Sequence, residues 1–124
     1  MNVKIDTKEK FTVVTPEIDH ISANMTAELN DLLLPYLQND IPHLILNLAS
    51  VKTIDEEGGE TLALIQQKFY EKDQSFVICN LQPAVEKTLD DKELLEIMNV
   101  TPTESEAWDI VQMEEIEREL LGGE

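Results

Sequence analysis

Residues 53–59 read Thr-Ile-Asp-Glu-Glu-Gly-Gly and place three consecutive carboxylates before two glycines. The stretch follows a strongly apolar run and precedes an amphipathic pattern, so it is predicted to join a strand to a helix. Asp55 is predicted to be the N-cap of that helix, its carboxylate accepting from backbone N–H groups two or three residues on. Glu56 and Glu57 then fall in the first turn, where the helix dipole favours each anion by roughly 0.3–1 kcal/mol. Acidic capping alone explains these residues, and the alternative is a negatively charged surface that serves function.

The other reactive side chains form no recognisable catalytic or metal-binding set. The chain has no phosphate loop ending in Gly-Lys-Ser/Thr and no G-x-G-x-x-G after a strand. His20 and His43 share no ligand-like spacing with each other or with Cys79, so both are predicted to be surface or strand-end residues. Cys79 ends the apolar run Phe-Val-Ile-Cys and is predicted to be a small core residue. We therefore expect no metal, no cofactor and no enzymatic activity.

Charge and length restrict the class of partner. The 124 residues include 26 acidic and nine basic side chains, for a formal net charge of −17. The basic residues are scattered, which argues against binding to nucleic acid or to anionic membranes. No apolar run approaches the ~20 residues that cross a bilayer, and the N-terminus lacks the pattern of a secretory signal. Because a single cysteine cannot form an internal disulfide, the expected location is the cytoplasm.

The acidic residues are concentrated at the C-terminus. From Glu104 to Glu124 eight acidic side chains accompany one base, Arg118. The sequence Thr103-Glu104-Ser105-Glu106 has the form of a capping box, so a helix is predicted over about 104–121, stopping at Gly122-Gly123. Its acids are either a solvated face that aids solubility or a surface that meets a basic protein partner.

The remaining patterns predict one domain over residues 1–124. A hairpin of two strands is expected at 2–7 and 11–16, buried strands at 43–48 and 75–80, and an edge strand at 100–103. An apolar stripe from Ile21 to Leu37 predicts a helix with Ser22 or Asn24 as N-cap, disturbed at its end by Pro35. Further helices should follow Gly59 and start near Pro83.

This order predicts an α/β domain with a mixed, mostly parallel sheet of four or five strands flanked by about four helices. Binding sites in such sheets tend to lie where strands end and helices begin. Residues 53–59 fall at such a place.

The stretch from Leu44 to Phe69 resembles the STAS family, the domain shared by sulfate transporters and anti-sigma factor antagonists. In that family an apolar strand and a short polar turn lead to Ile-Asp-Ser-Ser-Gly at the start of a helix. Here Ile54, Asp55 and Gly58 match, while two glutamates stand where the two serines would be. Softer matches at 21–33 and 75–111 extend the resemblance over nearly the whole chain.

The resemblance implies a regulatory binding module. In family members that regulate sigma factors, a partner serine kinase, which is also the anti-sigma factor, phosphorylates one serine of the pair and so ends binding. Glu56 occupies that position, which makes it a degenerate phosphosite. Phosphoserine carries about −1.5 to −2 charges, and Glu56 with Glu57 supplies a comparable formal charge. Either the domain is locked in a phosphorylated-like state, or it has left the relay and binds its partner constitutively.

The recognition surface is expected at Asp55, Glu56, Glu57, Gly58 and Gly59, with an anti-sigma factor or serine kinase-like protein as partner. Among the nearby hydroxyls, Thr53 is the best-placed alternative phosphoryl acceptor. The alternative function is small-ligand sensing. Because the acids would repel an anion, such a ligand would be neutral or cationic.

Overall fold

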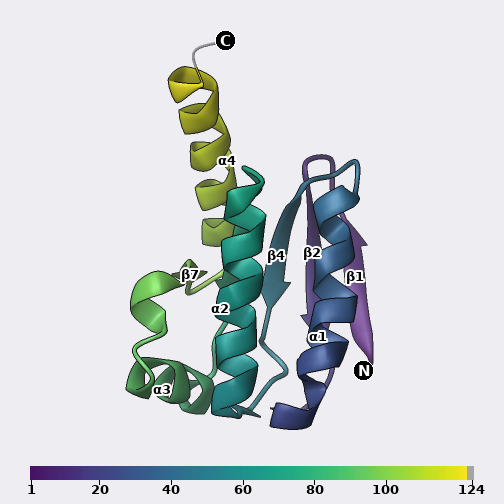
Figure 1. The fold of residues 1–124 in the computed structure, drawn as a ribbon, viewed down its shortest axis with the longest axis vertical. Helices are drawn as coiled ribbons and strands as arrows, with labels where there is room; N and C mark the ends of the chain where they lie inside the picture. The colour runs from purple at the N-terminus through teal and green to yellow at the C-terminus, as the bar shows by residue number, and fades with distance from the viewer. Residues whose placement is uncertain (123–124) are drawn as a thin grey trace.

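A five-stranded sheet in the order β1-β2-β4-β6-β7 runs through the structure (Figure 1). The computed structural model describes residues 1–122, so Gly123 of the predicted helix stop lies outside the described residues. The strands are β1 (Val3–Thr7), β2 (Phe11–Pro16), β4 (His43–Asn47), β6 (Phe76–Cys79) and β7 (Val100–Thr101). Only the β1–β2 hairpin is antiparallel, and the other neighbours are parallel. The predicted mixed, mostly parallel sheet is confirmed.

Helices cover both faces of this sheet. The first face carries α1 (Thr26–Leu33), α2 (Glu56–Glu71) and α3 (Pro83–Asp91), over a core shared with alternate residues of β4 and β6. The second face carries α4 (Glu104–Leu121) alone, whose Ala107 and Val111 pack on the intervening residues of the same strands. Burial on both faces explains why these strands are near-continuous apolar runs. None of the helices in residues 1–122 combines the length and apolarity needed to cross a membrane.

The stripe from Ile21 to Leu37 is not one helix, contrary to prediction. Ile21 belongs to the two-residue strand β3 (His20–Ile21), and the 3-10 turn η1 (Ala23–Met25) precedes α1. The 3-10 segment η2 (Leu34–Gln38) contains Pro35, since proline cannot continue the α-helical hydrogen bonding. Ser22, one of the two predicted N-cap residues, occupies the N-cap position of η1, but its side chain makes no capping hydrogen bond. Asn24 caps no helix, because Met25 is the residue that precedes α1.

The other helix starts agree with the sequence. Pro83 is the first residue of α3. Thr103 caps α4, its Oγ1 accepting from the backbone N–H of Glu106 at 3.2 Å. The apolar turn before β7 is the 3-10 segment η3 (Leu95–Ile97).

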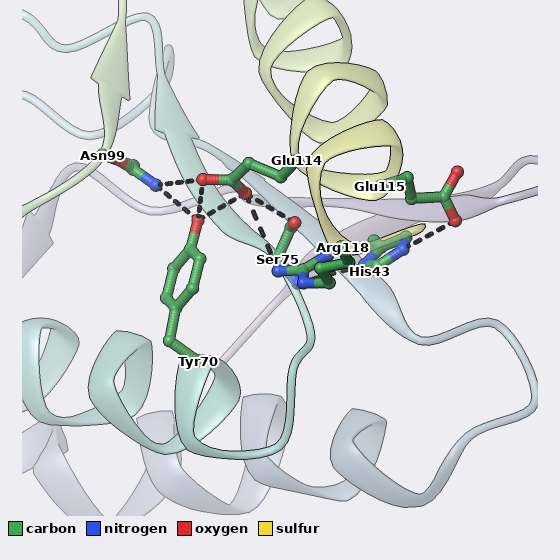
Figure 2. A network of polar contacts seen from close by, with 7 residues as sticks. All are labelled: His43, Tyr70, Ser75, Asn99, Glu114, Glu115 and Arg118. Carbon is green, nitrogen blue, oxygen red and sulfur yellow. Dashed lines mark hydrogen bonds and ion pairs between the residues drawn. The ribbon is translucent and has the colours of Figure 1, made fainter. Parts of the chain in front are cut away.

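A polar network fastens α4 beside the starts of β6 and β7 (Figure 2). The Glu114 carboxylate accepts hydrogen bonds from the Tyr70 hydroxyl at 2.8 Å, the Ser75 hydroxyl at 2.6 Å and the Asn99 amide at 3.2 Å. The Arg118 guanidinium lies 4.0 Å from Glu114 and 5.9 Å from the centre of the Tyr70 ring. Burial, and then the hydrogen bond to Glu114, raise the pKa of Tyr70 far above its ordinary value. The helix is therefore held by polar as well as apolar contacts.

Candidate functional site

The junction at residues 53–59 lies where two very short strands meet. The strand β5 (Thr53–Ile54) pairs in parallel with β3, with His20 opposite Thr53. The backbone N–H of Asp55 donates to the carbonyl of Ile21 at 2.8 Å, and α2 begins at the next residue. This pairing fixes where α2 starts. We call Asp55, Glu56, Glu57, Gly58 and Gly59 the acidic corner; it lies at the lower end of α2 in Figure 1.

Asp55 occupies the N-cap position of α2, but its carboxylate does not cap that helix. Oδ2 accepts a hydrogen bond from the backbone N–H of Ala23 at 2.9 Å, and Oδ1 lies 3.2 Å from Nε2 of His20. The predicted local cap is therefore wrong. The side chain instead satisfies the first N–H of η1 and joins it to the start of α2.

His20 connects Asp55 to Thr53. Its Nδ1 lies 2.7 Å from Oγ1 of Thr53, while its Nε2 faces Asp55. A neutral imidazole with its proton on Nε2 donates to the carboxylate and accepts from the threonine hydroxyl. Thr53 is an exposed residue, and in that tautomer its hydroxyl donates to Nδ1 of His20.

Glu56 and Glu57 lie in the first turn of α2, as predicted, and the structure shows that both are exposed. The Glu56 side chain is 61% exposed, and its Oε2 lies 3.6 Å from Nζ of Lys92. Lys92 also lies 3.8 Å from Oε2 of Glu60. Such exposed ion pairs contribute only about 0–1 kcal/mol to folding. Their importance here is electrostatic, because Lys92 offsets part of the negative charge of the corner.

Gly58 and Gly59 are buried and allow the close packing beneath the corner. A Cβ at Gly58 would lie 2.9 Å from Cγ2 of Ile21, and a Cβ at Gly59 would lie 2.7 Å from Cδ2 of Leu89. Both distances are too short for carbon atoms, so the first turn of α2 sits against β3 and α3 only because these residues lack side chains. The glycines shape the corner, and the two glutamates provide its exposed side chains.

Residues 55–59 line none of four surface hollows found among residues 1–122. Within the same residues, no three His, Cys, Asp or Glu side chains gather as a metal ion requires.

Comparison with known proteins assigns the chain to one family. The profile of the STAS domain matches residues 2–107. The chain belongs to the STAS family. A candidate anti-sigma factor antagonist from Thermotoga maritima superimposes on this STAS domain with a TM-score of 0.79 at 17% identity, covering 89% of this chain and 94% of that chain.

Two further solved structures share the fold. An anti-sigma factor antagonist STAS domain protein from Planctomyces limnophilus matches with a TM-score of 0.76 at 17% identity, covering 89% of this chain and 97% of that one. A serine-to-glutamate variant of RsbS from Moorella thermoacetica matches with a TM-score of 0.72 at 21% identity, covering 90% and 96%.

This STAS domain also gives partners to side chains for which the sequence predicted none. His43 begins β4 but is buried; its Nδ1 accepts from the backbone N–H of Ser75 at 3.0 Å, and its Nε2 lies 3.0 Å from Glu115. Cys79 is a buried core residue, as predicted. Burial and the nearby Glu104 carboxylate raise the pKa of the Cys79 thiol from 9.0 to about 12, which keeps it protonated and unreactive.

Two side chains that contact the corner were missed at the sequence level. His20 and Lys92 come from segments distant in the chain, before α1 and after α3. Neither residue is close enough in sequence to Asp55 or Glu56 for a local pattern to predict the contact.

Proposed function

We propose that this STAS domain is a regulatory protein-binding module rather than an enzyme, and that its partner binds at the acidic corner. The observation that carries the proposal is that Glu56 and Glu57 are exposed on a backbone whose position is fixed by contacts with neighbouring elements. Asp55 ties the corner to η1, and the buried Gly58 and Gly59 let it pack closely on its neighbours. A surface held in this way loses little conformational freedom when a partner binds.

Fixed charge takes the place of reversible phosphorylation in this proposal. Glu56 stands where the family pattern has its phosphorylated serine, and a carboxylate forms no stable phosphate ester. Phosphoserine carries about −1.5 to −2 charges, which Glu56 and Glu57 approach together. Lys92, at 3.6 Å from Glu56, reduces the field that a partner meets.

The proposed partner is an anti-sigma factor or a serine kinase-like protein with a basic surface. Three solved structures with this fold are named as anti-sigma factor antagonists. The net charge of −17 speeds association with a cationic protein and opposes binding to nucleic acid or to an anionic membrane. We place this complex in the cytoplasm.

A charge reversal at Glu56 tests the proposal. The tagged chain is used to recover partners from native lysate, which are identified and quantified by mass spectrometry. The wild type should recover a kinase-like or anti-sigma-like protein, and Glu56→Lys should lower recovery at least about tenfold, because attraction at the centre of the interface becomes repulsion. Glu71→Lys makes the same charge change at the other end of α2 and should leave recovery unaltered. Equal recovery by Glu56→Lys and wild type would exclude the acidic corner as the interface.

Serine substitution separates the two ways in which the fixed charge would act. The Glu56→Ser/Glu57→Ser variant is incubated with the recovered kinase and labelled ATP. Phosphate incorporation together with a changed affinity supports a phosphorylated-like lock, whereas an inert variant with unchanged affinity supports constitutive binding outside the relay.

Thr53 is the proposed alternative phosphoryl acceptor, because its exposed hydroxyl contacts the imidazole of His20. The wild type should then take up label on Thr53, and Thr53→Val should remove it. Label at any other hydroxyl would reject this assignment.

A further inference from the structure

The outward face of α4 is an apolar surface that the fold leaves uncovered. Met113, Ile116 and Leu120 are 57%, 56% and 75% exposed. Their spacing of three and four residues places them in one row along the helix, opposite the side that Ala107 and Val111 bury against the sheet. Single exposed apolar residues are ordinary, but a continuous row of large ones marks a contact surface. We call Met113, Ile116 and Leu120 the outer row.

Acidic side chains border the outer row. Between Glu104 and Leu121 the chain has seven acids and one base, Arg118. Figure 2 shows Arg118 within the half-buried polar network, where it faces Glu114 and the Tyr70 ring, so it does not offset charge on the outward side. Asp109, Glu117 and Glu119 are exposed beside the row. Two lysines lie at the edge of this surface, where Lys8 pairs with Asp6 at 3.0 Å and Lys10 pairs with Glu115 at 3.6 Å. Within residues 1–122, Asp109, Glu117 and Glu119 make no ion pair, so the surface combines apolar contact area with a net negative charge.

A hollow of about 640 Å³ adjoins the outer row, between α4 and the turn that joins β1 to β2. The stacked rings of Phe11 and Trp108, with centroids 4.5 Å apart, contribute to its lining. Ile116 belongs both to this lining and to the outer row, so the hollow extends the apolar surface sideways. It offers room for one large apolar side chain of a partner.

The network around Glu114 and Arg118 holds the middle of α4, so Met113 and Ile116 are presented without rearrangement. The charge distribution around the outer row indicates which kind of molecule binds there. A second copy of this chain would place one acidic border against another, between molecules of net charge −17 each. A basic helix with one apolar side meets both features, since helix-on-helix recognition uses apolar anchors at intervals of three and four residues.

We propose that the outer row and its acidic border form a docking surface for a basic amphipathic helix of a partner protein. This surface is separate from the acidic corner: the last turns of α4 and the start of α2 lie at opposite ends of Figure 1. The proposal therefore does not depend on what binds at the corner.

The test uses a labelled lysine–leucine peptide of about 18 residues whose leucines recur at helical spacing, and a peptide of the same composition in scrambled order. Binding to the full chain is measured by fluorescence anisotropy at physiological ionic strength, where exposed charges are screened beyond about 8 Å. The amphipathic peptide should bind at least about tenfold more tightly than the scrambled one. Ile116→Ser/Leu120→Ser should lose that advantage. Leu64→Ser, at a leucine of α2 that is 58% exposed, should retain it.

Charge variants of the protein and its oligomeric state provide further tests. Glu117→Gln/Glu119→Gln should weaken the amphipathic peptide several-fold, while Glu56→Lys should leave it unchanged. If the wild type binds both peptides with equal affinity, the attraction is unspecific and the proposal is overturned. The same holds if Leu64→Ser loses the preference for the amphipathic peptide as fully as Ile116→Ser/Leu120→Ser does. Loss of binding in Glu56→Lys would overturn it by moving the peptide to the acidic corner. A wild-type dimer in sedimentation that the outer-row variant abolishes would overturn it in favour of a second copy.

Discussion

Replacing Glu114 by alanine removes the acceptor around which α4 is fastened to the sheet. Three donors, on Tyr70, Ser75 and Asn99, lose their charged partner, and Arg118 loses its counter-charge. Removing one partner of a buried charged group typically costs about 3–5 kcal/mol. The Glu114 side chain is 22% exposed, so water will replace part of the loss. We therefore expect the free energy of unfolding to fall by about 2–4 kcal/mol.

The assay is urea unfolding followed by far-UV circular dichroism, with the free energy taken by linear extrapolation. Glu117→Ala is the matched control, because it removes an exposed acid from the same helix and should change stability by less than about 0.5 kcal/mol. Tyr70→Phe alone removes one donor and should cost about 1 kcal/mol. In the double variant the two losses should not add, and the coupling should be about 1–2 kcal/mol.

A loss below about 1 kcal/mol for Glu114→Ala would refute this reasoning, since buried donors without a partner cost more than that. Additive losses in the double variant would also refute it, because they would mean that Tyr70 and Glu114 stabilise the fold independently. A change of the urea slope would indicate instead that α4 detaches before the sheet unfolds.

Three further predictions concern the corner and the core. Gly58→Ala gains helix propensity worth about 1 kcal/mol but places a carbon 2.9 Å from the Cγ2 methyl group of the buried Ile21. Because overpacking costs about 1–3 kcal/mol, urea unfolding should show a net loss in the free energy of unfolding. A variant more stable than the wild type would contradict the packing argument. Asp55→Ala should cost about 1 kcal/mol and speed amide exchange at Ala23, whereas Ser22→Ala, which removes no side-chain cap, should do neither. Cys79 stays protonated in the fold while the unfolded thiol ionises above pH 9.0, so the stability that the buried thiol contributes is complete below that pH and is lost up to about pH 12. Between pH 9 and 10 the wild type should therefore lose about 1 kcal/mol more of its free energy of unfolding than Cys79→Ala does.

Elements with strong periodicity were predictable from the sequence, and two-residue elements were not. The runs at 43–48 and 75–80 gave β4 and β6, because strands buried on both faces are apolar throughout. Thr103 marked the start of α4 through a bond to its own helix. By contrast, β3 and β5 hold two residues each, too few to show an alternation, so the apolar stripe from Ile21 onward predicts a helix where the structure has a strand.

The candidate site shows the same division between local and distant interactions. The position of Glu56 and Glu57 in the first turn of α2 follows from local helix electrostatics, and it was predicted correctly. The carboxylate of Asp55 had a local donor available in principle but bonds to Ala23, 32 positions away. Contacts of this kind depend on which segments the fold brings together. They become predictable only when the tertiary arrangement is known.

The solitary position of α4 implies a gradient of protection against hydrogen exchange along a single helix. Amides near Ala107 and Val111 are covered by the sheet, so they should exchange only through opening of the whole domain. Beyond Arg118 the exposed turn ending at Leu120 and Leu121 relies on its own hydrogen bonds, and its amides should exchange by local fraying. A ligand that binds to that turn should therefore slow deuterium uptake in the last turn of the helix, with little change elsewhere.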